Sequence, residues 1–589
     1  MSGSPASSRR VLVADAGEPL AAHLVEILAG TLAPDPAARA GAGLGAGSWE
    51  VQHRIVTGRP GDVAPQTGAL ILVAERATPK GASAESTATE LTKGDLALLG
   101  LAAAWLRGSI RATPPEERPR RLILVSSAWV HEPSHRHLGY LSEDQLPKRP
   151  PENRVARRWR ALEAAFRERL EAVPGGRAAL VSVILRPTPI PMPDGRDPLS
   201  GLLRGRASWA PAGYNPPLQL LTVHELATAA RAALDDAVTG NEAGEPQVWQ
   251  VAPEEAIPLR WAMKAAGVRR LPAPAWTLRI ARSLAGSEPD GVDALCHAAT
   301  VSDARWRRIL AGLGRPLPPS TLQRPARELA HDPFGFDQAY VDRFRRTLFP
   351  FLHDLWWRVE WRGLEHVPRH GGGVLVGTHR GHQPWDGVMV LHRLAGELGR
   401  YPRFLIHPAL IKFPFLARYM AGLGGINACR ENGDWVLRQQ ELLGIFPEGI
   451  RGAFARYRNA YSLRRFRPDY VRFALQHQVP IVPFVVLGSA EIFPVLAKLQ
   501  WQWWKRLSDW PCLPVTPTLS TLPLPSKWHV EFLEPLDPAR EYGPEAAQDG
   551  DLVRRLNREV HQRMDEALQA LLTRRRHIFW GSLFNDAGA

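Results

Sequence analysis

Cysteine is scarce in this chain of 589 residues, which contains only Cys296, Cys429 and Cys512, far apart and without CxxC spacing. That scarcity argues against a disulfide framework or a cysteine-based zinc site, and it favours a reducing compartment. The sequence also lacks any uninterrupted apolar run of about 18 residues, so we expect no membrane-spanning helix. The first ten residues, MSGSPASSRR, lack the apolar core of a signal peptide. We therefore predict a cytoplasmic location.

Acidic residues are in the minority, with 59 Asp and Glu against 73 Lys and Arg, and the formal net charge is +14. This excess favours anionic partners: nucleic acid, phosphorylated small molecules or an acidic lipid surface. A GC-rich genome that encodes arginine in place of lysine accounts for it equally well. The total charge therefore does not select a function, whereas the length predicts at least two domains.

Short apolar runs alternate with helical stretches along the first part of the chain. RRVLVAD, GALILVAE, RLILVSSAWV and ALVSVILRP are candidate buried strands, and PLAAHLVEILAG and RVARRWRALEAAFRERLEAV are candidate helices. This alternation predicts a doubly wound parallel sheet with helices on both faces. We expect a first α/β domain over 8–290, a linker over 291–335, and a second α/β domain over 336–589 that begins its strands with GGGVLVGTH.

Residues able to carry chemistry follow two predicted strands of the second domain. In VLVGTHRGHQPWDG, His379 follows an apolar run and Asp386 lies seven positions later. A histidine can take a proton from a hydroxyl, and a carboxylate on its other ring nitrogen orients the imidazole. In LLGIFPEGIRG, Gly449 permits a tight turn and Arg451 can bind a phosphate through two parallel hydrogen bonds.

Together these blocks resemble the glycerophosphate and lysophospholipid acyltransferase family, which carries N-H-x4-D and F-P-E-G-[TS]-R. The second block here is FPEGIR, residues 446–451; GGINACR, ending at Arg430, resembles the glycine-to-arginine block, and VPIVP, 479–483, the proline block. The resemblance covers roughly 335–540. It implies transfer of a fatty acyl group from acyl-CoA or acyl carrier protein (acyl-ACP) to a lysophospholipid or glycerophosphate-type hydroxyl, such as that of 1-acylglycerol-3-phosphate.

The resemblance also implies roles for individual residues. His379 would act as the base and Asp386 as its partner, while Arg451 and Arg430 would hold the acceptor's phosphate. Glu448 would position Arg451 or the acceptor. The remaining residues implied to bind substrate are Phe446, Pro447, Gly449 and Pro480. The mechanism needs no metal or organic cofactor.

Two departures from the family pattern concern the acceptor and the base. Six residues separate His379 from Asp386 instead of four, as in a longer H-x-G-x-x-P-[FWY]-D-G loop, and His382 with Asp386 is a rival pair. We favour His379 because it directly follows the predicted strand. Ile450 replaces the small hydroxyl residue, which removes one possible hydrogen bond to the acceptor. The acceptor's identity, the donor (acyl-CoA or acyl-ACP) and the oligomeric state stay open.

Aromatic and basic residues cluster in three segments of the second domain: 344–361, 451–472 and 493–510. Seven arginines stand against one acid between Arg451 and Arg472, and four tryptophans lie between Phe493 and Trp510. Such segments are typical of elements that lie in the headgroup layer of an anionic bilayer. We predict a peripheral protein on the inner membrane face; the alternative is a tryptophan-rich core.

The first domain resembles the extended short-chain dehydrogenase and epimerase family over roughly 8–285, but it lacks that family's chemistry. The glycines of its G-x-x-G-x-x-G turn become Asp15, Glu18 and Ala21. Neither Tyr140 nor Tyr214 is followed by lysine four positions on, so Ser127 has no catalytic partners. We predict a Rossmann-like scaffold that does not bind NAD(P).

Two other functions stay open: a bifunctional oxidoreductase–acyltransferase and a non-catalytic lipid-binding assembly protein. Nucleic-acid binding is disfavoured, because the basic residues belong to the enzyme-like blocks and no groove-reading element occurs.

Overall fold

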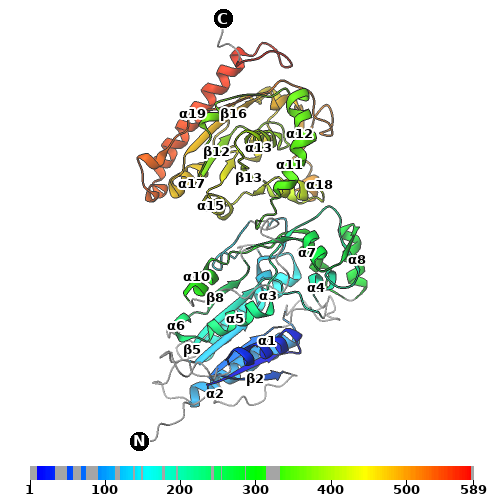
Figure 1. Ribbon diagram of the computed structural model, residues 1–589, viewed down its shortest axis with the longest axis vertical. Coiled ribbons are helices and arrows are strands. Elements are labelled where there is room, and N and C mark those ends of the chain that lie inside the picture. The colour runs from blue at the N-terminus through cyan, green and yellow to red at the C-terminus, as the bar shows by residue number, and fades with distance from the viewer. Residues whose placement is uncertain are drawn as a thin grey trace. The chain divides into compact units, whose positions relative to one another are not determined.

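The computed structural model divides into two compact units, residues 1–335 and 336–589 (Figure 1). The structure describes residues 9–32, 49–56, 68–74, 91–112, 120–136, 139–146, 150–174, 180–193, 197–239, 244–253, 255–285, 287–312 and 332–584. None of the helices in these ranges combines the length and the apolar character that crossing a membrane requires.

The first unit is built on a six-stranded parallel sheet with the order β2-β1-β3-β4-β5-β8. Its strands are β1 (Arg9–Asp15), β2 (Trp49–Ile55), β3 (Ala69–Val73), β4 (Arg120–Val125), β5 (Leu180–Pro187) and β8 (Gln247–Val251). The chain moves from β1 outward to β2 and then crosses to β3 on the other side of β1. The prediction of a doubly wound parallel sheet is therefore confirmed.

Alternate residues of these strands face two separate cores, as strand periodicity requires. Val11 and Val13 of β1 pack into one core, and Leu12 and Ala14 into the other. The first core is covered by α1 (Pro19–Leu32), α5 (Val223–Ala233) and α10 (Ala304–Gly312), and the second by α2 (Lys93–Ala112) and α3 (Arg154–Glu171). Because α9 (Asp293–Cys296) and α10 lie within 291–335, the stretch predicted as a linker contains secondary structure.

Smaller elements complete the first unit. Strands β6 (Ala207–Pro211) and β10 (Arg269–Ala273) form a parallel pair, and β7 (Pro217–Leu218) pairs with β9 (Ile257–Pro258). The helices beside them are α4 (Pro198–Leu202), α7 (Leu259–Ala265) and α8 (Ala275–Leu284), whereas α6 (Asp236–Thr239) packs against α5.

The second unit contains a seven-stranded sheet with the order β11-β19-β16-β12-β15-β13-β14, in which β19 runs antiparallel to β16. Its strands are β11 (Glu360–Arg362), β12 (Gly373–Gly377), β13 (Arg403–Ile406), β14 (Ile426–Asn427), β15 (Leu442–Ile445), β16 (Ile481–Leu487) and β19 (His529–Phe532). Strands β12, β13, β14, β15 and β16 are parallel, so their carboxyl ends meet at one edge.

Helices cover both faces of this second sheet (Figure 1). One face carries α11 (Gln338–Arg346), α12 (Leu348–Pro350), α13 (Trp385–Glu397) and α14 (Leu416–Gly422), whose apolar residues join the strands in a single core. The other carries α15 (Arg430–Arg438), α17 (Asp469–His477) and α19 (Gly550–Arg574). A hairpin of β17 (Ala497–Leu499) and β18 (Leu513–Val515) has α18 (Gln502–Ser508) between its strands. The predicted pair of α/β units is thus confirmed.

Candidate active site

The candidate site lies at the carboxyl ends of four neighbouring parallel strands. His379 follows β12, Phe446 follows β15, His407 follows β13, and Arg430 follows β14 and begins α15. Parallel sheets bind ligands at this edge because the loops there leave every strand on the same side. Three of the four blocks singled out from the sequence therefore meet in space, although up to about 70 residues separate them along the chain.

His379 and Asp386 form a hydrogen-bonded pair. The distance from His379 Nδ1 to Asp386 Oδ2 is 2.7 Å, and the backbone N–H of Arg380 donates to the same oxygen at 3.0 Å. Asp386 lies in the first turn of α13, so the longer loop between the two residues returns the carboxylate to the end of β12. Thr378 holds the loop by accepting a hydrogen bond from the Val486 N–H at 2.9 Å. The arrangement leaves His379 Nε2 for another partner.

His382, the rival candidate, has a different environment. Its side chain is buried, and neither ring nitrogen has a hydrogen-bond partner among the described residues. Burial, and to a smaller extent the nearby His379, lowers its pKa from 6.5 to about 4. Asp386 therefore forms its histidine hydrogen bond with His379 and not with His382.

Arg380 is a site residue that the sequence analysis missed. Its Nη1 lies 2.6 Å from Glu448 Oε1 and also donates to the carbonyl oxygen of His379 at 2.9 Å. The second carboxylate oxygen of Glu448 accepts from the backbone N–H of Arg464 at 2.9 Å. Both oxygens of Glu448 thus bind groups other than Arg451, and the expectation that Glu448 positions Arg451 or the acceptor stays a prediction. A charged residue directly after His379 was the available signal.

The backbone of the turn after β15 shows why the FPEG block contains a proline and a glycine. Gly449 has φ +58° and ψ −157°, a backbone conformation that is essentially restricted to glycine, and it begins the short helix α16 (Ile450–Ala453). The Pro447 carbonyl accepts from the Arg467 N–H at 3.1 Å. The Phe446 ring lies between two neighbours, with its centroid 5.3 Å from that of Phe404 and 4.8 Å from that of His379. This turn therefore builds the floor beneath the imidazole.

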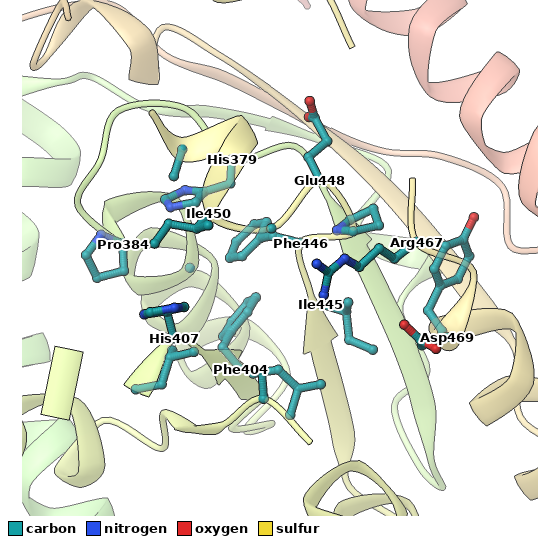
Figure 2. A pocket seen from close by; sticks show the side chains of 18 of the residues that line it. His379, Pro384, Phe404, His407, Ile445, Phe446, Glu448, Ile450, Arg467 and Asp469 are labelled. Atoms are coloured by element: carbon teal, nitrogen blue, oxygen red, sulfur yellow. The ribbon is translucent and has the colours of Figure 1, made fainter. Parts of the chain in front are cut away.

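A cavity of about 1120 Å³ extends from His379 past Phe446. Figure 2 shows Arg467 and Asp469 on the opposite side of Phe446 from His379, and it shows the Glu448 carboxylate directed away from the other labelled side chains. Five arginines and two acids line the cavity; they are Arg430, Arg451, Arg465, Arg467, Arg472, Glu448 and Asp469. The apolar lining includes Val388, Leu391, Phe404, Ile406, Met420 and Phe446. The cavity thus combines an apolar wall with a cationic one.

The two arginines predicted to bind phosphate lie in the cavity, whereas the proline predicted to bind substrate lies outside its described lining. Arg451 and Arg430 both line the cavity and have exposed side chains, and Arg430 donates to Gln476 at 2.9 Å. Pro480 does not belong to the described cavity lining: its carbonyl accepts from the Val374 N–H at 2.9 Å. Since β12 and β16 are parallel, this contact lies at the end of β12 opposite His379. The predicted substrate-binding role of Pro480 is therefore corrected to a backbone contact.

The aromatic residues between Arg451 and Arg472 also required correction. Phe454, Phe466 and Tyr470 are buried, so they belong to the interior and not to a headgroup layer. Most of the arginines of this segment are exposed, as the sequence suggested. Tyr457 of the same segment is 36% exposed, and more strongly exposed aromatic residues occur around α18.

The first unit carries a carboxylate where a dinucleotide-binding turn would present backbone N–H groups. Asp15, at the end of β1, is buried, and its Oδ1 accepts from the N–H groups of Gly17 at 2.6 Å and Glu18 at 2.8 Å. Its Oδ2 lies 2.6 Å from His53 Nε2 on β2. The start of α1 thus has an internal anion, which competes for the place of a bound phosphate.

The remaining dehydrogenase-like positions have structural partners. The Tyr140 O–H donates to Asp303 at 3.0 Å, and Ser127 accepts from the Trp129 N–H at 3.2 Å to cap a short helix. Within the described ranges, no group of three or more His, Cys, Asp and Glu side chains is placed so as to hold a metal ion.

Part of the second unit matches a known protein family. A family model described as "Acyltransferase" matches residues 358–487. The uncharacterized protein Rv0502 of Mycobacterium tuberculosis is 34% identical over 268 residues, which cover 44% of this chain and 74% of that protein. The uncharacterized protein ML2427 of Mycobacterium leprae is 33% identical over 268 residues and is covered to 72% of its length, again over 44% of this chain.

Two solved structures are similar to different parts of the chain. The crystal structure of the 1-acyl-sn-glycerophosphate acyltransferase PlsC from Thermotoga maritima is 18% identical, with a TM-score of 0.28, and the match covers 41% of this chain and 81% of PlsC. The human epimerase family protein SDR39U1, crystallised with NADPH, is 17% identical, with a TM-score of 0.36, and the match covers 54% of this chain and 98% of that protein.

Proposed function

Because this chain belongs to the acyltransferase family, we propose that its second unit transfers a fatty acyl group from a thioester to the hydroxyl of a lysophospholipid or glycerophosphate-type acceptor, such as 1-acylglycerol-3-phosphate. The observation that carries this proposal is the 2.7 Å pair of His379 and Asp386, beside a cavity with an apolar and an arginine-rich wall.

His379 acts as a general base in this reaction. Asp386 accepts a hydrogen bond from the Nδ1–H group of His379, which fixes the tautomer of the imidazole. The lone pair of Nε2 is then available to the acceptor's hydroxyl. As Nε2 takes the hydroxyl proton, the oxygen attacks the thioester carbonyl, the C–O bond forms and the C–S bond breaks. The proton then passes from His379 to the departing thiolate. Acyl-CoA and acyl-ACP both supply this thioester.

The arginines of the cavity bind the acceptor's phosphate. Arg451 and Arg467 offer planar donors that match a phosphate, and Arg430 and Arg465 add positive charge. Glu448 does not cancel this charge, because it is already paired with Arg380. The apolar wall receives an acyl chain, so one cavity accommodates both ends of a lysolipid.

A surface around α18 brings this reaction to an anionic membrane. Trp503 and Leu507, four residues apart on α18, are each 57% exposed, and Trp501 stacks on Trp503 with ring centroids 5.7 Å apart. Lys505 and Arg506 lie on the same helix. Tryptophan beside basic residues suits an anionic headgroup layer. Other exposed apolar residues of the unit include Phe351, Leu355, Phe415, Leu519 and Leu522.

Two side-chain contacts link these exposed residues in pairs of segments, and we name the exposed residues together the apolar face. Lys412, close to Phe415, pairs with Asp509 beside α18 at 3.0 Å. The indole of Trp356 donates to the Pro523 carbonyl at 3.0 Å, which links the segment of Phe351 and Leu355 to that of Leu519 and Leu522. Trp510, which follows α18, lines the cavity. A lipid on the apolar face is thus close to the site.

Vesicle co-sedimentation tests the membrane contact. We expect the wild type to bind phosphatidylglycerol-containing vesicles, less tightly as salt is raised. The double variant Trp503→Ser with Leu507→Ser should bind at least about tenfold more weakly, because it removes two inserted side chains. Trp276→Ser is the control, since Trp276 is 63% exposed but lies in the other unit. Equal binding by the double variant and the wild type would contradict the apolar face.

The activity is tested with purified protein, labelled acyl-CoA and acyl-ACP, and a panel of lysolipids, with products identified by mass spectrometry. We expect transfer to a phosphate-bearing acceptor and a loss of at least about 10³-fold in His379→Ala, because the base is removed. A wild type that acylates no lipid would contradict the proposal. A fully active His379→Ala would favour a different mechanism.

For the first unit we propose a scaffold that binds no dinucleotide. The Asp15 carboxylate accepts the N–H groups that a pyrophosphate would need, and its charge repels an anion at close range. This supports a single-activity acyltransferase over a bifunctional enzyme.

A further inference from the structure

His382 is a buried polar residue at the candidate site with no partner for either ring nitrogen among the described residues. Its side chain is 4% exposed, and it lines the same cavity as His379, three positions away along the loop after β12. The mechanism proposed above gives it no task.

The surroundings of His382 are aromatic. Its ring centroid lies 5.3 Å from that of Phe493, 5.8 Å from that of Phe454 and 6.1 Å from that of Trp510. A polar ring in such a place loses its hydrogen bonds to water and recovers none from the part of the chain that the structure describes, which destabilises the fold. An apolar side chain would fill the same space without that penalty. Since buried polar groups in folded proteins are nearly always paired, a ligand atom in the cavity that His382 lines would supply the missing partner.

The position of His382 selects the ligand group. In the proposed reaction the arginines bind the acceptor's phosphate, and His379 binds the acceptor's hydroxyl. The carbonyl oxygen of the acyl donor is the oxygen of the reacting thioester that has no partner so far, and the donor's chain suits the aromatic walls around His382. We propose, resting on the acyl-transfer function above, that His382 donates its ring N–H to the carbonyl oxygen of the donor thioester.

This hydrogen bond strengthens during the reaction. As the acceptor's oxygen attacks, the carbonyl oxygen gains negative charge, and a donor held in a water-poor site stabilises that charge more than the neutral carbonyl. Burial lowers the pKa of His382 to about 4, so the imidazole is neutral at pH 7 and carries one N–H donor. No proton leaves His382, and the proton balance of the transfer is unchanged.

Three variants test the proposal, assayed with the full-length protein under the conditions of the activity test. We expect His382→Phe to lower kcat about 10²- to 10³-fold with little change in the KM for the acceptor, because the lost interaction forms mainly in the transition state. His382→Gln keeps an N–H donor and should recover part of kcat. His392→Phe is the matched control, because burial also lowers the pKa of His392 to about 4 but His392 does not belong to the described cavity lining.

Thermal unfolding separates this role from a structural one. Since His382 is unpaired in the ligand-free fold, His382→Phe should keep or raise the Tm, as replacement of a functional but destabilising residue does. A kcat within about threefold of wild type, or a lower Tm with no recovery in His382→Gln, would overturn the proposal. A wild type without transfer activity would contradict the proposed function itself, whereas an active wild type with an unaffected His382→Phe would contradict only this role.

Discussion

Arg380 connects the base to the phosphate turn. The guanidinium of Arg380 donates to the backbone carbonyl of His379 and to the carboxylate of Glu448. The backbone N–H of Arg380 donates to the carboxylate of Asp386. The side chains of Arg380 and Glu448 are 1% and 2% exposed, so the pair is almost free of competition from water. One arginine therefore couples the strand end that carries the base to the strand end that carries the FPEG turn.

Breaking this pair should affect both stability and catalysis. In Glu448→Gln the Arg380 charge stays buried without its counter-charge, and we expect a loss of about 3–5 kcal/mol in the free energy of unfolding. We also expect a lower kcat, because the backbone of His379 loses its support. Urea unfolding and the transfer assay check the two effects. Glu365→Gln, at an exposed glutamate away from the cavity, is the control. An unchanged unfolding midpoint in Glu448→Gln would contradict this account.

The Asp386 carboxylate orients His379 as well as stabilising its charge. Asp386→Asn keeps the shape of the side chain but favours the wrong tautomer of the imidazole, so kcat should fall by about 10⁴. The transfer assay measures this fall, and circular dichroism establishes that the variant is folded. A variant with more than a tenth of wild-type kcat would show that the imidazole does not depend on Asp386.

The candidate site residues lie at the carboxyl ends of parallel strands. Parallel pairing of β12 with β15 brings His379 and Phe446 together, because both residues follow the carboxyl end of their strand. The same pairing of β12 with β16 places Pro480 at the opposite end, away from the cavity. A block can thus resemble a family's site block and yet contribute only a backbone contact.

Helix α2 is held to α3 in the first unit by a buried ion pair. Asp95 accepts two hydrogen bonds from Arg158, both at 2.8 Å, and one from the N–H of Thr92 at 2.9 Å, at the start of α2. In Asp95→Ala the arginine charge loses its buried counter-charge, and the backbone N–H of Thr92 loses the carboxylate that accepts from it. We expect a loss of about 3–5 kcal/mol in the free energy of unfolding.

Urea unfolding of the Asp95→Ala variant measures this loss. The exposed pair of Arg136 and Glu152, 2.9 Å apart, provides the control, since Glu152→Ala should cost less than about 1 kcal/mol. Equal costs for Asp95→Ala and Glu152→Ala would contradict the importance of burial.

The molecule as a whole pairs an acyltransferase unit with a Rossmann-like unit whose first turn already holds an anion. We expect no saturable binding of NADH or NADPH in an equilibrium fluorescence titration, because Asp15 accepts the N–H groups at the start of α1. Saturable binding of either dinucleotide would overturn this prediction and reopen the bifunctional alternative.

Buried histidines in both units make the protein sensitive to acid. Burial lowers the pKa of His382, His392 and His529 to about 4 and that of His297 to about 3. The folded state thus holds these rings neutral, while the unfolded chain protonates them below about pH 6.5. The free energy of unfolding therefore decreases as the pH falls from about 6.5 toward 4, because the unfolded chain binds protons that the folded state excludes, whereas above pH 6.5 these rings add no pH dependence.

We therefore expect the urea midpoint to decrease between pH 7 and pH 5, with each such histidine contributing a slope of up to about 1.4 kcal/mol per pH unit. His529→Gln should flatten the decrease, whereas a change at the exposed His224, His224→Gln, should not. A midpoint independent of pH over this range would contradict the neutral state of the buried rings.

The sequence by itself determined the two α/β units, because strand and helix periodicity are local properties of the chain. It also determined that His379, Asp386, Phe446 and Arg451 surround one site, because the carboxyl ends of parallel strands meet at one edge. Only the tertiary structure decided that Asp386 bonds His379 and not His382, and that Glu448 pairs with Arg380. Such pairings depend on how a loop returns to a strand and on which side chains are shielded from water. Neither the path of the loop nor the burial of these side chains can be predicted from the spacing of residues along the chain.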